Sequence, residues 1–264
     1  YSIADALTIA SENPSKKIVF FAIGFETTTP PTALAIRQAQ KMNLTNFFVF
    51  CNHLLTPAAI VSILDSPEVK TLGTLPLDGF IGPAHVSTVI GSNPYESFAK
   101  DYKSPVVIAG FEPLDVLQAI YMLIKQVNDQ RSEVENEFIR AVTVDGNEKA
   151  KAIMADVFET RDTFEWRGLG QVPNSALKIK KRYQQWDAEA YFSLAPLTAS
   201  TPSLENKACE CPAILRGVKK PIDCKLFGNV CTPENPIGSC MVSSEGACAA
   251  YYNYGRHSSK EDTA

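Results

Sequence analysis

The sequence predicts an α/β protein with doubly wound, mainly parallel sheet units, followed by a C-terminal lobe that is rich in cysteines and loops. Apolar runs alternate with helix-like segments through the first half of the chain, which is typical of strands buried on both faces of a parallel sheet. Six of the seven cysteines lie between Cys209 and Cys248, in a segment with several Gly and Pro and little periodicity. We therefore expect a packed sheet region and a lobe wrapped around a metal.

The predicted strands are short apolar runs that precede helix-like segments. They lie at residues 18–23, 47–51, 79–81 and 106–109. The predicted helices cover residues 3–12, 33–42, 56–64, 85–90 and 114–127. Hydroxyl side chains and proline stand at two of the helix starts, where they favour the first turn. The repeated alternation predicts parallel strands joined by helical crossovers.

The second half of the chain divides where the composition changes. A charged stretch at residues 126–137 separates the sheet region from residues 138–177, whose signals are mixed. Residues 194–206 are rich in Ser, Thr and Pro and are predicted as a linker, and the polar tail after Tyr254 is expected to fray. We predict three parts: an α/β domain with cleft-lining loops over residues 1–130, a second mixed α/β region and linker over 131–204, and a cysteine-rich lobe over 205–264.

Composition excludes several classes of protein. The 264 residues, 45% of them hydrophobic, suffice for one large or two smaller domains. A net charge of −4 gives no global basic field that would attract nucleic acid or an anionic membrane. No apolar run approaches the roughly 18–20 residues of a membrane-spanning helix. The odd number of cysteines argues against a secreted protein stapled by disulfides, and we expect a cytoplasmic protein.

Three loops between strands and helices carry unusual residues. Their sequences are GFETTTP at 24–30, GPAHVS at 82–87 and GFEP at 110–113. Ligands bind at the carboxyl ends of strands in sheets of this class, so we expect the three loops to meet. Glycine permits a close approach, and helix starts supply N–H groups that suit a small anion or a polarised ligand. The candidate cleft residues are Glu26, Glu112 and His85.

A structural role is the competing interpretation of these side chains. Both glutamates can cap the helices that follow them, as can Thr28. A lone histidine at a helix start is often structural, and His53 and His257 have no comparable loop around them. Cys51 follows a strand and is predicted to be a buried core thiol. The pattern alone leaves both interpretations of the glutamates open.

The cysteines of the lobe follow an irregular spacing: Cys209, Cys211, Cys224, Cys231, Cys240 and Cys248. The paired C-x2–4-C knuckles of zinc modules are absent, as is the C-x2-C-x2-C run of ferredoxins. Six cysteines exceed the four that one metal ion or one cluster needs, so the surplus pair is a disulfide or a redox-active dithiol. Spacing alone leaves iron–sulfur and zinc equally open, with disulfides third.

These motifs together resemble the HypD family of [NiFe]-hydrogenase maturation factors. The resemblance includes the three loops, the run PIDCKLFG at 221–228 and the highly specific run GSCMVSSEGACAAYY at 238–252, and it covers essentially the whole chain. It implies a [4Fe–4S] cluster, because the family's ligand spacing fits Cys209, Cys224, Cys231 and Cys248.

The resemblance assigns roles to other residues as well. It implies that Cys211 and Cys240 form a redox-active disulfide near the cluster. It also implies that the loops line a cleft in which an iron centre is built, with Glu26, Thr27, Thr28 and His85 around it. HypD proteins bind the small partner HypC, and together they hold an iron that becomes Fe(CN)2CO, with cyanide supplied by HypE. The role implied is more an assembly scaffold with redox activity than a turnover enzyme.

One departure and two alternatives accompany this hypothesis. The family pattern has an N-terminal part with an iron-ligating cysteine and a Cys-Pro-x-Cys pair, which this sequence lacks. We therefore expect an N-terminally incomplete chain that binds a cluster without completing maturation. The alternatives are an α/β enzyme that uses Glu26, Glu112 and His85 in acid–base chemistry, and a zinc-stabilised interaction module with structural cysteines.

Overall fold

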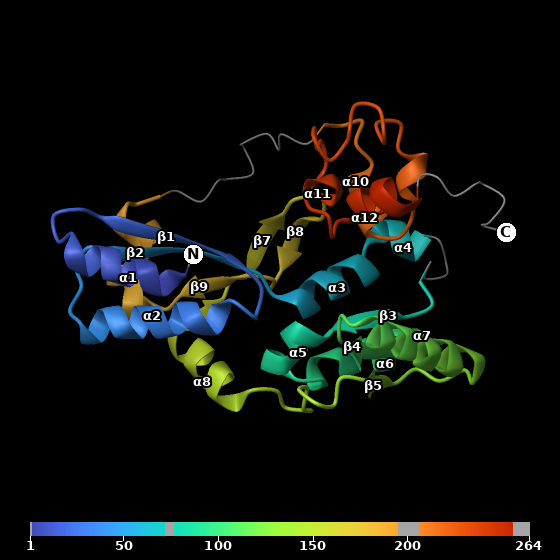
Figure 1. Ribbon diagram of the computed structural model, residues 1–264, viewed down its shortest axis with the longest axis horizontal. Helices are drawn as coiled ribbons and strands as arrows, with labels where there is room; N and C mark the ends of the chain where they lie inside the picture. Colours follow the sequence, from blue (N-terminus) through green and yellow to red (C-terminus); the bar gives the residue numbers. More distant parts are fainter. Residues whose placement is uncertain (1, 72–76, 195–205, 256–264) are drawn as a thin grey trace. The chain divides into compact units, whose positions relative to one another are not determined.

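A computed structural model describes residues 2–71, 77–194 and 206–255 (Figure 1). Contacts between residues divide the chain into two compact units. Unit 1 comprises Tyr1–Ala59, Asp78–Phe164 and Pro173–Thr198, and unit 2 comprises Ile60–Leu77, Glu165–Val172 and Ala199–Ala264. The division into three parts at residues 130 and 204 stays a prediction.

The first sheet of unit 1 is a pair of parallel strands. β1 (Ile18–Gly24) pairs with β2 (Phe47–His53), and Gly24 lies beside His53 at the carboxyl end of the pair. The helices α1 (Ile3–Glu12) and α2 (Thr29–Lys41) pack on this sheet (Figure 1). Their shared core is made of buried apolar side chains, among them Ala22, Ala33, Ile36, Phe47 and Val49.

The second sheet of unit 1 has three parallel strands in the order β3-β4-β5. These strands are β3 (Phe80–Pro83), β4 (Val106–Ala109) and β5 (Val134–Asn136). Every residue of the central strand β4 is buried, as expected for a strand with neighbours on both sides. The helices of this part are α5 (Ala84–Ile90), α6 (Glu96–Tyr102), which follows the short helix η1 (Asn93–Tyr95), and α7 (Pro113–Asn128), which packs on β4.

The remaining elements extend the core of the first sheet. The helix α8 (Glu148–Val157) packs against α2, and β6 (Phe158–Thr160) pairs antiparallel with β9 (Leu177–Ile179). They are followed by η2 (Lys181–Trp186) and α9 (Ala188–Tyr191). The helix α3 (Thr56–Leu64) and the paired strands β7 (Thr163–Trp166) and β8 (Gly170–Pro173) run across the boundaries between the two units.

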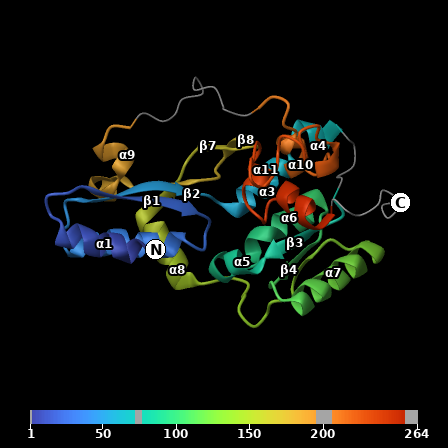
Figure 2. The same ribbon diagram turned by 45° about the horizontal axis from the view of Figure 1, so that its top comes forward.

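Unit 2 contains the cysteine lobe, which is the name used here for residues 206–255. Its helices are short and lie close together (Figure 2). They are α10 (Cys211–Leu215), η3 (Pro221–Asp223), α11 (Ser239–Val242), α12 (Ala247–Ala250) and η4 (Tyr251–Gly255), and unit 2 also includes α4 (Pro67–Thr71). Loops make up the rest of the lobe, as the Gly- and Pro-rich sequence predicts.

The mixed α/β class, the parallel pairing and the cysteine-rich C-terminal region are confirmed. The strands form separate small sheets where the structure describes them, and the doubly wound arrangement of the sheet units stays a prediction. The charged stretch at 126–137 is more than a separator, because it contains the end of α7 and all of β5. The linker at 194–206 lies almost entirely outside the described residues, and so do His257 and the tail from residue 256.

None of the described helices is both long enough and apolar enough to span a membrane.

Candidate cleft and thiol cluster

The first loop turns Glu26 into the interior. Gly24 has a φ of +120°, and a Cβ there would lie 2.4 Å from the Thr28 hydroxyl, so this turn requires glycine. Glu26 is only 1% exposed. Its Oε1 accepts a hydrogen bond from the Thr56 N–H at 2.8 Å, and its Oε2 accepts one from the Thr56 hydroxyl at 2.9 Å. The carboxylate therefore holds the start of α3 rather than capping its own helix α2.

Burial also sets the ionisation of Glu26. Removal from water raises the pKa of the carboxyl, while hydrogen bonds from its own backbone and from Thr56 oppose the rise. The same charge reaches Tyr95, whose pKa is raised to about 12, mainly by burial and further by the Glu26 carboxylate. The Tyr95 oxygen accepts a hydrogen bond from Ser87 of the second loop at 3.3 Å. Glu26 is thus electrostatically linked to the second loop.

His53 lies under the first loop, and the sequence analysis missed it. Its Nδ1 is 3.4 Å from the Thr28 hydroxyl and its Nε2 is 3.0 Å from the Thr32 hydroxyl. Thr28 makes no capping bond, since its hydroxyl donates to the carbonyl of Phe25 at 3.0 Å. Burial lowers the pKa of His53 to about 4, so the ring is neutral at pH 7. No sequence motif marks His53, because the pairing of β1 with β2 places it beside Gly24.

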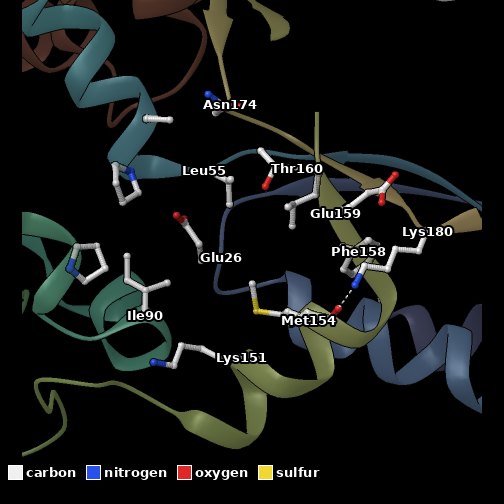
Figure 3. A pocket seen from close by; sticks show the side chains of 15 residues that line it. Glu26, Leu55, Ile90, Lys151, Met154, Phe158, Glu159, Thr160, Asn174 and Lys180 are labelled. Atoms are coloured by element: carbon white, nitrogen blue, oxygen red, sulfur yellow. Dashed lines mark hydrogen bonds between the residues drawn. The ribbon is translucent and has the colours of Figure 1, made fainter. Parts of the chain in front are cut away.

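A pocket of about 580 Å³ opens beside Glu26 (Figure 3). Its walls are largely apolar, and polar side chains from β6, α8 and the β9 region add to them (Figure 3). The lining residues include Glu26, Leu55, Ile90, Lys151, Met154 and Phe158. Glu26 is the only predicted cleft residue that lines this pocket. An apolar pocket with one buried carboxyl suits a small ligand with few polar groups.

The second and third loops contact each other through aromatic rings. His85, exposed at the start of α5, meets Phe111 edge to face with 4.7 Å between ring centroids. Glu112 is 79% exposed, makes no capping bond to α7, and lies 3.8 Å from Arg140. Thr27 is exposed as well. In the described ranges no hydrogen bond joins Glu26, His85 and Glu112 to one another.

Cys51 is a buried thiol, as predicted. It donates a hydrogen bond to the Leu177 carbonyl at 3.4 Å, and burial raises the pKa of Cys51 to about 12. It belongs to the apolar core of the first sheet. Cys51 is therefore a packing residue. It belongs to a different hydrophobic core from the cysteines of the lobe.

The six lobe cysteines, named here the thiol cluster, form the core of the cysteine lobe. Five of them are buried and Cys209 packs against the others. The Cys240 N–H donates to the Cys211 sulfur at 3.4 Å, and the Cys240 thiol donates to the Cys248 sulfur at 3.1 Å. The Ile237 N–H donates to the Cys231 sulfur at 3.4 Å. All are thiols, with no disulfide among the described cysteines.

Crowding makes negative charge costly in this cluster. Burial, followed by the nearby sulfurs of Cys211, Cys224 and Cys231, raises the pKa of Cys209. The hydrogen bond that the Cys211 thiol donates to Cys240, together with burial, raises the pKa of Cys211 far above the ordinary range. The Cys211 hydrogen bond lowers the pKa of Cys240, but the bond to Cys248 and burial outweigh it and raise that pKa to about 12. Thiolates here require a cationic partner, which metal ions provide.

The absence of a side chain at Gly238 leaves room for the sulfur of Cys209. A Cβ on Gly238 would lie 2.6 Å from the Cys209 sulfur and 2.9 Å from the Cys211 Cβ, so a side chain at 238 would displace both cysteines. Within the described ranges no group of three His, Cys, Asp or Glu side chains is arranged so that it could hold a single metal ion. Ligands of a four-iron cluster each bind a different iron, so shared burial of several thiols is the relevant test. By that test the donor set fits an iron–sulfur cluster.

Comparison with known proteins places this site in context. The sequence profile of the HypD family, described as "Hydrogenase formation hypA family", matches residues 1–255. The chain is 67% identical over 256 residues to "Hydrogenase expression/formation protein HupD" of Azotobacter chroococcum and 65% identical over 256 residues to "Hydrogenase maturation factor HypD" of Cupriavidus necator. It is 43% identical over 260 residues to "Hydrogenase maturation factor HypD" of Escherichia coli. In the order given, these alignments cover 97%, 97% and 98% of this chain. They cover 66%, 66% and 67% of the three relatives, so the chain spans about two thirds of their length.

Proposed function

The chain belongs to the HypD family, and on that premise we propose that it is the cluster-holding part of a hydrogenase maturation factor. The observation that carries this proposal is the core of the cysteine lobe, which gathers five buried thiols, with the partly buried Cys209 packed against them. An ordinary small lobe would use apolar side chains there. The role is that of an assembly scaffold with redox activity.

The cluster ligands in this proposal are Cys209, Cys224, Cys231 and Cys248. They would hold a [4Fe–4S] cluster, which supplies one-electron redox capacity when bound. Support comes from the raised pKa of Cys209, whose neighbours include Cys224 and Cys231. Iron would offset the negative charge that the Cys209 thiol avoids in its absence.

The remaining two cysteines form the redox pair of this proposal. The Cys240 N–H already contacts the Cys211 sulfur. Oxidation of the two thiols to a disulfide would release two electrons and two protons, and reduction would take them up again. The Cys240 thiol also contacts Cys248, a proposed ligand, so the pair adjoins the cluster site.

The cleft loops would shape the place where the iron cargo is assembled. We assign Glu26, Thr27, Thr28, His85 and Glu112 to this cleft. The cargo is an iron that becomes Fe(CN)2CO, bound together with HypC and supplied with cyanide by HypE, in the cytoplasm. Support comes from the apolar pocket beside Glu26, which suits a small ligand with little hydrogen-bonding capacity such as carbon monoxide.

Anaerobic purification followed by iron, sulfide and zinc analysis tests the cluster. We expect about four irons and four sulfides per chain, with a brown visible spectrum. Serine at Cys209, Cys224, Cys231 or Cys248 should abolish the spectrum, and serine at Cys211 or Cys240 should preserve it. A colourless chain that holds about one zinc would contradict the proposal.

Anaerobic size-exclusion chromatography with HypC tests the partner. We expect the two proteins to elute as one complex. Substitution of the exposed His85 by alanine, compared with substitution of the exposed Lys100 on α6, should weaken the complex if the cleft loops contribute. Separate elution of the unsubstituted proteins would remove HypC from the proposal and leave the cluster assignment standing.

A further inference from the structure

Cys240 lies between two possible sulfur partners. Its thiol donates to the Cys248 sulfur at 3.1 Å, and its N–H contacts the Cys211 sulfur at 3.4 Å. The Cys211 and Cys240 thiols are also hydrogen-bonded to each other. All three cysteines are buried. One sulfur forms one disulfide at a time, so a bond from Cys240 to either neighbour excludes a bond to the other.

The backbone enforces the contact between Cys240 and Cys248. Cys240 is in α11 and Cys248 is in α12, and a turn joins these helices through the hydrogen bond from the Gly246 N–H to the Ser243 carbonyl at 3.0 Å. A Cβ on Gly246 would lie 2.4 Å from the Cys240 carbonyl oxygen. Glycine at 246 therefore permits the close approach that brings the two thiols together.

We propose that Cys240 forms two mutually exclusive disulfides, one with Cys211 and one with Cys248, and that occupancy of Cys248 by the cluster selects between them. The exclusive pairing rests on the sulfur contacts alone. The selection rests on the proposed function, in which Cys248 is a cluster ligand. A bound Cys248 is committed to iron, which leaves Cys211 as the partner of Cys240.

The oxidation is balanced when a small disulfide such as oxidised glutathione is the oxidant. One Cys240 or Cys248 thiolate attacks the glutathione disulfide and releases one glutathione. The other thiolate then attacks the mixed disulfide, forms the Cys240–Cys248 bond and releases a second glutathione. The two protein thiols lose two electrons and two protons, and one glutathione disulfide becomes two thiols.

The two disulfides also interconvert without any oxidant. The Cys248 thiolate attacks the Cys240 sulfur of a Cys211–Cys240 disulfide, so the Cys240–Cys248 bond forms and the Cys211–Cys240 bond breaks. The proton lost by Cys248 ends on the Cys211 sulfur. In the cluster-free lobe this exchange places Cys248 in a disulfide. A reductant must then break that disulfide before Cys248 can bind a cluster.

Disulfide mapping of the cluster-free chain tests the exclusive pairing. The reduced protein is treated with oxidised glutathione, alkylated, digested and analysed by mass spectrometry. We expect a Cys240–Cys248 linkage in the unsubstituted chain and in Cys211→Ser, and a Cys211–Cys240 linkage in Cys248→Ser. Cys51→Ser, which alters a buried thiol of the first sheet, should change nothing. A linkage only between Cys211 and Cys240 in the unsubstituted chain would overturn the inference.

The same mapping after cluster reconstitution tests the selection. With iron and sulfide retained, we expect the Cys240–Cys248 linkage to fall at least tenfold and the Cys211–Cys240 linkage to replace it. A loaded cluster together with an unchanged Cys240–Cys248 linkage would refute the selection and leave the proposed function intact. Failure of any cluster to load would count against the proposed function and against the selection, whereas the cluster-free map would still decide the pairing.

Discussion

The core of the first sheet and the core of the cysteine lobe have different chemistry. Under β1 and β2 the buried groups are Phe47, Val49, Ile36 and small alanines, carried by helices of 10 and 13 residues. In the lobe the buried groups are mostly thiols, with Ile214 and Met241 among the few apolar side chains. The lobe helices α10, α11 and α12 have only five, four and four residues.

The difference between an apolar core and a thiol core indicates where the stability of each region comes from. Burial of large apolar side chains stabilises the first sheet without any ligand, at about 25 cal/mol for each Å² removed from water. Helices of one turn contribute little alone, because nucleation of a helix is costly. We therefore expect the lobe to gain much of its stability from a group that binds its thiols, as small metal-binding domains do.

The largest expected effect is on the apolar core. Phe47 is fully buried, whereas Phe21 on the neighbouring strand is 57% exposed. We expect Phe47→Ala to lower the free energy of unfolding of unit 1 by about 3–5 kcal/mol, because it leaves a cavity. Phe21→Ala, which loses only a stacked contact with Phe50, should cost about 1 kcal/mol or less. Urea denaturation measures both, and equal losses would contradict the assignment of this core.

The next effect separates the two kinds of buried thiol. In protein loaded with iron and sulfide, Cys224→Ser should remove the stabilisation that a tightly bound ligand gives the folded lobe, on the order of 2–4 kcal/mol. Cys51→Ser should keep the full iron content, since Cys51 lies in the apolar core. Thermal melting measures the stability of both variants, and iron analysis measures their iron content. Equal iron loss in the two would show that burial, and not position in the lobe, decides the outcome.

A smaller effect compares the two Gly-Phe-Glu loops. Glu26→Ala leaves the Thr56 N–H and hydroxyl without their acceptor, so we expect a loss of about 1–3 kcal/mol in the free energy of unfolding. Glu112→Ala removes an exposed carboxylate that is 3.8 Å from Arg140 and should change stability by about 0.5 kcal/mol or less. Chemical denaturation at pH 7 compares them. A larger loss in Glu112→Ala would reverse the roles of the two loops.

A further effect appears only in mild acid. The pKa of His53 is lowered from 6.5 to about 4 in the folded chain. Between pH 6.5 and pH 4, His53 is therefore protonated in the unfolded chain but neutral in the folded chain. The His53 contribution to stability is therefore complete above pH 6.5 and is lost as the pH falls toward 4. Melting temperatures from pH 7 to pH 4.5 should fall more steeply in the unsubstituted chain than in His53→Gln. Parallel curves would show that His53 protonates without cost in the fold.

The sequence predicts the regular elements well and their pairing less well. Apolar runs identify all four expected strands. Burial on both faces holds for β2 and β4, but β1 exposes Val19, Phe21 and Ile23 on one face, so the expectation of burial on both faces is wrong for that strand. β5 is missed because Val134–Asn136 is short, lies at the edge of its sheet and is only partly buried. Periodicity does not report which strands pair, so the separation into small sheets is visible only in the structure.

The candidate site shows the same division. The cysteine spacing and the loop motifs point to the thiol cluster and to Glu26, yet no sequence signal shows that Glu26 bonds to Thr56, 30 residues away. His53 has no motif of its own and acquires its position from strand pairing. The contact between Cys240 and Cys248 depends on the turn at Gly246, which sequence spacing does not reveal.

Hydrogen–deuterium exchange of the chain before and after cluster reconstitution tests the central claim most directly. If the cysteine lobe is held together by a cluster and the first sheet by apolar packing, amides in residues 209–255 should gain protection on reconstitution. Amides in β1 and β2 should exchange at the same rate in both forms. Equal protection of the lobe in the metal-free and reconstituted chains would contradict the claim.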